Sequence, residues 1–237
     1  MPAYRTTQAS TAIAGVADLR IRSLLDRQQL DDPQGHAARL GISSAAWPLF
    51  GLPWPSGLQL AARLALRPVR AGERILEVGC GLALASLVGH RRGADVTASD
   101  YHPLASSFLR ANLRLNRLPP LSYRHGHWSR DPAEGAAGGP SATSSSIVRG
   151  RYDLIIGSDL LYERDPGGAL ARFIGRHAGA AAEVWIVDPD RGNRPAFSRH
   201  MAAQGFGCSE QRIDVAALAG ADGYKGRMLT YRRGMAG

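Results

Sequence analysis

The sequence predicts an α/β protein built on a doubly wound, mostly parallel seven-stranded sheet. From residue 74 onward, seven short apolar runs occur, most of them separated by helical patterns. In such an alternation each helix links two parallel strands. The run at 154–156 has no polar face, which indicates a strand covered on both sides. No helical pattern separates the last two runs, at 208–215 and 227–233, so these are expected to form a terminal antiparallel hairpin.

The individual elements follow from residue periodicity. Short runs rich in Val, Ile and Leu are typical of strands, and longer runs with apolar residues three and four apart are typical of helices. Strands are expected at 73–79, 95–100, 121–128, 152–159, 182–188, 208–215 and 227–233, and helices at 83–92, 103–116, 167–178 and 194–205. Pro103 is expected in the first turn of its helix, where an N–H group is not needed.

The first 45 residues carry weaker patterns. Leu19 and Ile21 alternate with charged residues, which suits a short half-buried strand. The segment 31–41 begins with Asp-Asp-Pro and ends in Gly, and it predicts a short helix between turns. We expect residues 1–45 to form an N-terminal extension that packs on the core.

Residues 46–237 are expected to form the main domain. Its first segment, 47–57, contains three prolines, which deny regular hydrogen bonding and predict a shaped loop. Ser56 is expected to cap a helix that runs to about residue 67. The segment 131–146 consists mainly of Pro, Gly, Ala and Ser, so it is expected to be a flexible surface insertion.

The composition is that of an ordinary globular protein. Apolar residues make up 44% and charged residues 21% of the 237 residues, which excludes wholesale disorder. Two cysteines cannot form a disulfide framework, and the histidines show no zinc-ligand spacing, so no metal site is expected. No apolar run reaches the roughly 18 residues of a membrane span, and the N-terminus lacks a secretory pattern. We therefore expect a monomeric cytoplasmic protein without membrane association.

The formal net charge of +9 raises the hypothesis of an anionic partner such as nucleic acid. Of the 29 basic residues 28 are arginine, and Lys225 is the only lysine. The arginines are scattered, with adjacent pairs only at 91–92 and 232–233. A dispersed basic surface is therefore favoured over a dedicated phosphate-binding stripe, and an anionic partner remains the alternative.

A glycine-rich turn carries the main functional signal. The strand at 73–79 ends in Glu77-Val-Gly79-Cys80-Gly81 and passes directly into a helix. Glycines there let a ligand approach the backbone, and the helix N-terminus presents free N–H groups. The next strand ends at Asp100, nineteen residues after Gly81, where a carboxylate can accept hydrogen bonds from a ribose diol.

Two residues favour S-adenosylmethionine over a dinucleotide as the ligand of this turn. A dinucleotide fingerprint needs Gly or Ala where this chain has Leu84, because a larger side chain obstructs the diphosphate. Glu77 would repel a diphosphate, whereas it suits a ligand that carries an ammonium and a sulfonium group. We predict S-adenosylmethionine, with a glycine turn that binds no ligand as the alternative.

These segments resemble class I, seven-strand S-adenosylmethionine-dependent methyltransferases. The resemblance rests on EVGCGLALASL, the strand end at Asp100, HGHW and DLIIGSDLLYE, and it covers residues 47–233. Within the class, the chain is most similar to the protein-lysine methyltransferases, including the electron-transfer-flavoprotein β-subunit lysine methyltransferase and bacterial relatives. That group shares a Trp-Pro segment, here Trp54-Pro55, and an Asp-x-x-Tyr motif, here Asp159 to Tyr162. Ala83 replaces a third glycine, a departure that its small side chain is expected to tolerate.

The resemblance implies a role for each candidate residue. The cofactor-binding set is Trp54, Glu77, Gly79, Gly81, Asp100, Tyr101, Trp128 and Ser158. Trp128 is expected beside the adenine and Trp54 as a cofactor or substrate wall, with simple packing as the alternative for both. Asp159 and Tyr162 are the catalytic candidates, at the sheet edge where ligands bind. The segment 188–191 follows the next strand, and it either shapes the acceptor pocket or forms a turn.

A lysine acceptor sets a condition on this chemistry. Protonated lysine, with a pKa near ~10.4, has no lone pair and must lose its proton before transfer. The charge of Asp159 favours the ammonium form, whereas apolar desolvation by Trp54 and Tyr162 favours the neutral amine. Asp159 is therefore predicted to orient a protein lysine side chain and not to act as a strong base.

Three other functions remain open. Methyltransferases that act on nucleic-acid amino groups resemble one another in an Asn/Asp-Pro-Pro-Tyr/Phe motif, whose prolines are absent between Asp159 and Tyr162. Nucleic acid is thus possible as a partner but is not favoured. A small-molecule methyltransferase could use the Trp-Pro loop as a lid. A non-catalytic cofactor-binding module is disfavoured by the complete set of motif residues.

Overall fold

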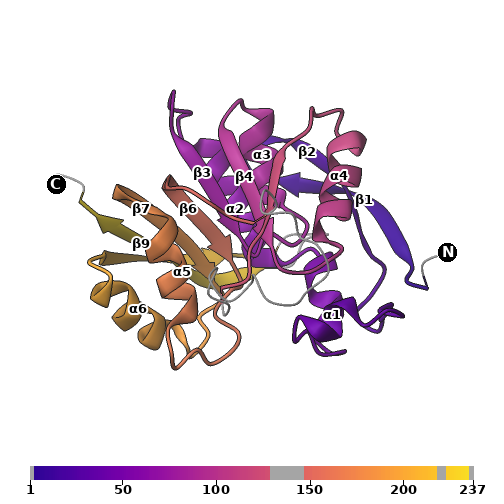
Figure 1. Cartoon of the computed structure of the whole chain (residues 1–237). Helices are drawn as coiled ribbons and strands as arrows, with labels where there is room; N and C mark the ends of the chain where they lie inside the picture. The colour runs from indigo at the N-terminus through magenta and orange to yellow at the C-terminus, as the bar shows by residue number, and fades with distance from the viewer. Residues whose placement is uncertain (1–2, 129–146, 218–222, 235–237) are drawn as a thin grey trace.

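The computed structural model describes residues 3–128, 147–217 and 223–234. A seven-stranded sheet forms its centre, with the strand order β5-β4-β3-β6-β7-β9-β8 (Figure 1). Strands β3 to β7 run parallel, and β9 pairs antiparallel with both β7 and β8. The bounds are β3 Arg74–Val78, β4 Asp95–Asp100, β5 Ser122–His125, β6 Tyr152–Ser158, β7 Ala178–Asp188, β8 Gly207–Val215 and β9 Tyr224–Arg233. The predicted doubly wound, mostly parallel sheet with a terminal antiparallel hairpin is confirmed.

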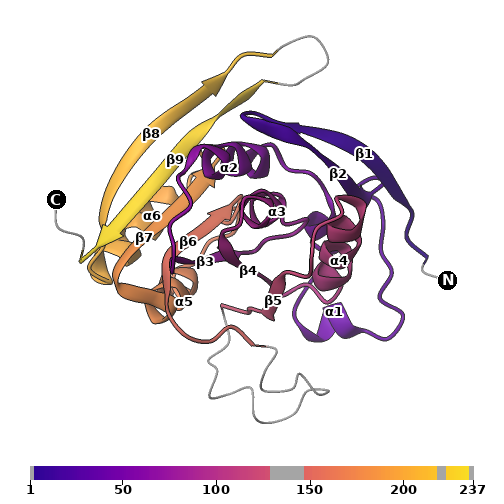
Figure 2. The same ribbon diagram turned by 90° about the horizontal axis from the view of Figure 1, so that it is seen from above.

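Helices cover both faces of the sheet. Their bounds are α1 His36–Arg39, the 3₁₀ helix η1 Trp47–Gly51, α2 Pro55–Leu66, α3 Leu84–Arg91, α4 Ala105–Leu115, α5 Ala169–His177 and α6 Arg194–Ala203. Helices α2, α3 and α4 lie on one face, and α5 and α6 lie on the other (Figure 2). Leu154 and Ile156 of β6 belong to the first core, and Ile155 between them belongs to the second. Successive side chains of a strand point to opposite faces, so a strand with helices on both sides needs an unbroken apolar run.

The N-terminal segment forms a second, two-stranded sheet instead of the single strand expected around residue 20. Strand β1 (Thr6–Ile13) pairs antiparallel with β2 (Val16–Leu24). The sequence pattern missed β1 because TTQASTAI is mostly polar and exposed. Strand β2 buries Leu19 and Ile21 in the core that also contains α4.

Three details of the predicted elements were wrong. Ser56 does not cap α2: the helix starts at Pro55, and the buried Ser56 hydroxyl hydrogen-bonds the Tyr224 hydroxyl of β9 at 3.0 Å. Pro103 precedes α4, whose cap residue is Leu104. The strand expected at 121–128 ends at His125, because its partner β4 ends opposite it at Asp100.

Two further expectations concern an insertion and membrane association. The proposed flexible insertion at 131–146 lies outside the described residues. No helix in the described part of the chain is long and apolar enough to cross a membrane.

A ladder of two asparagines joins β2 to α4. Asn112 accepts the Arg22 N–H through Oδ1 at 2.7 Å and donates Nδ2 to the Arg22 carbonyl at 3.3 Å. One helical turn later, Asn116 makes the same pair of bonds with Arg20, at 2.9 and 2.8 Å. Asn112 is fully buried, whereas the contacts of Asn116 with Arg20 are exposed.

We expect Asn112→Ala to destabilise the protein by about 2 kcal/mol, because the Arg22 backbone groups would lose their partner where water has little access. The comparison variant Asn116→Ala removes the corresponding exposed bonds to Arg20 and one bond to the Asn112 carbonyl, and we expect a smaller loss of about 0.5 kcal/mol. Urea denaturation measures both. Equal losses would contradict the assignment of the hairpin anchor to the buried asparagine.

Candidate functional site

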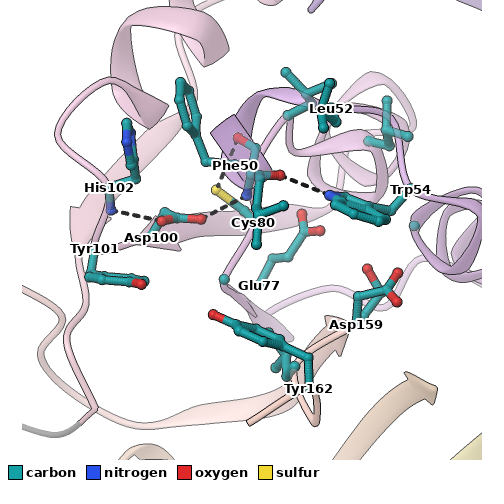
Figure 3. Close-up of a pocket in the computed structure, with 18 of the residues that line it drawn as sticks. Phe50, Leu52, Trp54, Glu77, Cys80, Asp100, Tyr101, His102, Asp159 and Tyr162 are labelled. Carbon is teal, nitrogen blue, oxygen red and sulfur yellow. Dashed lines mark hydrogen bonds between the residues drawn. The ribbon is translucent and has the colours of Figure 1, made fainter. Parts of the chain in front are cut away.

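One pocket lies at the carboxyl ends of the parallel strands, and all ten residues singled out from the sequence line it. They are Trp54, Glu77, Gly79, Gly81, Asp100, Tyr101, Trp128, Ser158, Asp159 and Tyr162. Figure 3 labels Trp54, Glu77, Asp100, Tyr101, Asp159 and Tyr162 among them. They come from the ends of β3, β4 and β6, from the segment after β5 and from the start of α2. Loops that follow neighbouring parallel strands meet at one edge of the sheet, which explains why residues distant in sequence converge. The individual roles of these residues stay predictions.

The glycines of the β3–α3 turn are required by the protein's own packing. Gly79 and Gly81 have φ angles of 60° and 51°. A Cβ on Gly79 would lie 2.5 Å from Leu160 Cδ2, and one on Gly81 would lie 2.9 Å from the Phe50 carbonyl oxygen. The left-handed φ of both glycines and, for Gly81, the nearby Phe50 carbonyl oxygen are reasons for glycine that lie within the protein itself. The approach of a ligand to this turn stays a prediction.

Ala83 was expected to replace a glycine without consequence, because its side chain is small, but its backbone conformation matters as well. It is the N-cap of α3 with φ 61°, in the left-handed region, and it is fully buried. Left-handed backbone is strained for any residue with a Cβ. The replacement of a family glycine by Ala83 is therefore a matter of backbone strain and not only of side-chain size.

Glu77 is a buried acid on the pocket wall. Its carboxylate accepts hydrogen bonds from the Ser86 N–H at 2.8 Å and from the Ser86 hydroxyl, at the N-terminal part of α3. Burial raises the pKa of Glu77 to about 7, although the bonds from Ser86 lower it. The nearby Asp100 raises the pKa further. A charge at this position is thus poorly stabilised in the free protein, and a bound cation would stabilise it.

Asp100 links the glycine turn to the end of β4. One carboxylate oxygen accepts the Gly81 N–H at 2.8 Å, and the other accepts the His102 N–H at 2.8 Å (Figure 3). Burial raises the pKa of Asp100, and these backbone donors act in the opposite direction. Because a carboxylate oxygen has two lone pairs, Asp100 can still accept bonds from a ligand's hydroxyl groups.

The 3₁₀ helix η1 forms a wall that the sequence did not predict. Phe50 stacks on the His102 ring with centroids 3.7 Å apart and an interplanar angle of 10°, and Trp47 contacts both rings edge-on. Burial lowers the pKa of His102 to about 3, so the imidazole is neutral at physiological pH. Leu49 completes the wall by accepting the Trp54 indole N–H at 2.8 Å. The density of Trp, Pro and Gly in 47–57 was the available signal, but periodicity does not reveal which rings stack.

Asp159 occupies the opposite side of the pocket. Its φ of 57° is left-handed, and its side chain is 13% exposed. Arg191, from the segment after β7, approaches Asp159 Oδ1 at 3.1 Å. Burial raises the pKa of Asp159, whereas the Ser56 hydroxyl and Arg191 lower it. Arg191 of the segment 188–191 lines the cavity, and a role of this segment in shaping an acceptor pocket stays a prediction.

Aromatic side chains border the pocket between Asp100 and Asp159. Tyr101 and Trp128 have ring centroids 5.9 Å apart, and the hydroxyl end of Tyr162 points toward Tyr101 (Figure 3). Burial raises the pKa of Tyr101, and a hydrogen bond with Tyr162 opposes the shift. The Tyr162 side chain is 39% exposed. The aromatic border offers contacts both to a flat ring of a ligand and to an aliphatic chain that enters the pocket from solvent.

Two methyltransferases of known structure have the same fold. A methyltransferase from Pyrococcus furiosus matches with a TM-score of 0.55 at 18% identity, over 84% of this chain and 98% of its own. The magnesium protoporphyrin IX methyltransferase of Synechocystis, solved with bound SAM (S-adenosylmethionine), matches with a TM-score of 0.53 at 16% identity, over 75% and 78%. The fold is that of class I methyltransferases. At these identities the likeness establishes the fold alone.

Two curated zebrafish (Danio rerio) proteins are similar in sequence. The electron transfer flavoprotein beta subunit lysine methyltransferase is 28% identical over 149 residues, which are 61% of this chain and 51% of the relative. Protein N-lysine methyltransferase METTL21A is 27% identical over 175 residues, which are 72% of this chain and 66% of the relative. The chain thus spans half to two thirds of their lengths. No family model matches the chain. The resemblance to lysine methyltransferases indicated by the sequence is confirmed by these relatives.

We expect Ala83→Gly to stabilise the protein by about 1 kcal/mol, because glycine adopts left-handed backbone without strain. The control Ala85→Gly places the same change two residues later inside α3, where glycine lowers stability by about 1 kcal/mol. Chemical denaturation gives both values. A loss of stability in both variants would show that the φ of Ala83 is not strained.

We expect Glu77→Gln to stabilise the ligand-free protein at pH 8 by roughly 2 kcal/mol, but not at pH 4. The folded-state pKa of about 7 lies above the unfolded value of 4.5, so the wild type loses stability as pH rises between them. The Gln oxygen can still accept both Ser86 bonds. Thermal melts across this range, with the exposed Glu163→Gln as control, measure the effect. A pH-independent difference would contradict it.

Proposed function

We propose that the protein is an S-adenosylmethionine-dependent methyltransferase that acts on protein lysine side chains. The observation that carries the proposal is the convergence of the glycine turn, Asp100 and the Asp159–Tyr162 segment on one pocket. The names of the two curated relatives support lysine as the acceptor. A protein partner follows from a lysine acceptor.

The chemistry of the pocket wall fits S-adenosylmethionine. Three carboxyl groups, those of Glu77, Asp100 and Asp159, face a cavity whose remaining wall is largely apolar or aromatic. An acidic wall favours a ligand with sulfonium and ammonium groups and opposes a diphosphate. Leu84 lines the same cavity, where its side chain would obstruct the diphosphate of a dinucleotide. Among the described residues, no group of three or more His, Cys, Asp or Glu side chains could hold a metal ion.

Each part of the wall would hold a different part of the cofactor. Asp100 would accept hydrogen bonds from the ribose hydroxyls, and Glu77 would face the positive charge. Tyr101 and Trp128 offer flat apolar surfaces to the adenine. The bound cofactor supplies a methyl group that its sulfonium already activates, so the chain has no covalent intermediate to form.

Asp159 and Tyr162 would position the acceptor. Asp159 Oδ2 is buried without a hydrogen-bond partner and can accept an N–H from the amine. The half-exposed Tyr162 would contact the methylene chain of a lysine that enters from solvent. Fixing the nitrogen in line with the transferred methyl group lowers the barrier by orientation, and solvent takes up the released proton.

We expect Asp159→Asn to slow methyl transfer by about 10²-fold, because the amide would donate one N–H towards the amine and misplace it. Affinity for S-adenosylmethionine should change less than threefold, since the carboxylate is assigned to the acceptor. Isothermal titration and initial rates with radiolabelled cofactor and a cell lysate separate these effects. The control is Asp153→Asn, an exposed residue near the other end of β6 whose carboxylate accepts the Arg74 N–H.

The same labelling experiment identifies the acceptor. Label on lysine should survive nuclease, disappear with protease and locate to N-methyl-lysine by mass spectrometry. Label sensitive to nuclease, or present in a small-molecule fraction, would replace lysine with one of the other acceptor classes. Label released by mild base would indicate a carboxyl ester.

A further inference from the structure

A cation is built into the proposed acceptor side of the pocket. Arg191 Nη1 lies 3.1 Å from Asp159 Oδ1 and 3.4 Å from the Asp159 carbonyl oxygen. The side chains of Arg191 and Asp159 are 33% and 13% exposed. Among the described residues that line the pocket, Arg191 is the one Lys or Arg side chain. The carboxylate assigned to the acceptor is therefore already paired with a positive charge.

The position of Arg191 is fixed by its surroundings. The backbone N–H of Arg191 donates a hydrogen bond to Oδ1 of the fully buried Asp188 at 2.7 Å. The adjacent Asp190 is held by Arg227 at 2.8 Å and by Arg194 at 3.6 Å. These contacts tie the segment after β7 to β9 and α6, and they fix the backbone from which the guanidinium reaches Asp159.

Backbone strain occurs on both sides of the pair. Asp159 and Asp190, which precedes Arg191, have φ angles of 57° and 67°. Each left-handed non-glycine residue is unfavourable by about 1 kcal/mol or more. Such conformations persist where the surrounding structure imposes them, and they concentrate at functional sites. The strain is thus a second observation, independent of charge, that marks this pair.

The other groups around Asp159 do not neutralise it. Ser56 from α2 and Tyr224 from β9 are neutral hydroxyls, and burial raises the pKa of Tyr224 to about 12. Asp188 from β7 is acidic, and burial raises its pKa, with Asp159 adding to the shift. Glu77 and Asp100, from β3 and β4, line the same cavity and are also acidic. Tyr101 and Tyr162 complete the neutral wall. Without Arg191, the described charged side chains that line the pocket would all be acidic.

Such a pocket would work against an amine acceptor. A lone carboxylate stabilises an ammonium ion, which has no lone pair with which to attack a methyl group. An arginine beside that carboxylate cancels its field and disfavours a second cation, since like charges repel. We propose that Arg191 is a positioning residue that makes the acceptor side of the pocket selective for an uncharged amine by holding Asp159 Oδ1 in an ion pair. Asp159 Oδ2 then remains to orient that amine. This inference rests on the proposed lysine methylation.

The test is the pH dependence of lysine methylation in Arg191→Gln. Initial rates are measured from about pH 6 to pH 10 at saturating S-adenosylmethionine and a saturating amount of the acceptor that the labelling experiment identifies, so that the profile reports the bound amine. We expect the rising limb of the profile to move to higher pH by about one unit, which is about a tenfold loss at neutral pH that alkaline pH recovers. Arg191→Lys retains a cation and should restore most of the wild-type profile.

A matched control separates this effect from damage to the loop. Arg194→Gln removes ion pairs with Asp190 and Glu210 in the same segment but does not line the pocket. We expect it to lower stability without moving the pH profile. A rate loss in Arg191→Gln that is equal at every pH would reduce Arg191 to a structural role and overturn the inference.

A readout without substrate keeps the two proposals distinguishable. Carbon-13 NMR of the Asp159 carboxyl should show a higher pKa in Arg191→Gln than in the wild type, because the stabilising cation is gone. An unchanged Asp159 titration would overturn the ion pair whatever the acceptor is. Lysine methylation with an unshifted profile would overturn the role of Arg191 and leave the proposed function intact. Absence of labelled lysine in the wild type, while Asp159 titrates as expected, would overturn the proposed function and the inference resting on it.

Discussion

The geometry of the pocket depends on the buried carboxylate of Asp100, which holds three segments together. It accepts the Gly81 N–H from the turn after β3 and the His102 N–H from the segment after β4. His102 in turn stacks on Phe50 of η1, and the Phe50 carbonyl oxygen lies 2.9 Å from where a Cβ on Gly81 would be. The same acid that is assigned to the ribose therefore also builds the wall around it. Loss of its charge would loosen the turn and the wall together.

A second constraint is the amount of acid buried around the cavity. Burial raises the pKa of Glu77, Asp100, Asp159 and Asp188, so their ionised forms are destabilised in the free protein. Donors within the protein offset part of this destabilisation. Ser86 donates hydrogen bonds to Glu77, backbone N–H groups donate to Asp100, and Arg191 forms an ion pair with Asp159. A cationic ligand beside Glu77 would offset more. The unfavourable charge distribution of the free protein is the feature that would suit it to S-adenosylmethionine, the proposed cofactor.

Left-handed backbone recurs around the same cavity. Gly79 and Gly81 adopt it without strain, whereas Ala83, Asp159 and Asp190 adopt it with a Cβ. Sharp turns after β3, β6 and β7 bring the strand ends close to one another, and the conformations follow from those turns. The side chains of Asp159 and Asp190 each join an ion pair with an arginine from another segment, which helps to hold the strained turns in place.

The sequence by itself determined the sheet and its hairpin, because these depend on local periodicity. The ten pocket residues came from strand ends that converge at one edge, together with the resemblance to a known family of methyltransferases. The sequence did not determine β1, whose polar residues show no alternation, or the function of Ser56, whose hydroxyl bonds to Tyr224 on the distant β9. The contact of Gly81 with Phe50, the stacking of Phe50 on His102 and the pairing of Arg191 with Asp159 were decided by tertiary structure alone. Each is a contact between segments far apart in the chain, and spacing along a sequence carries no information about which side chains meet across a fold.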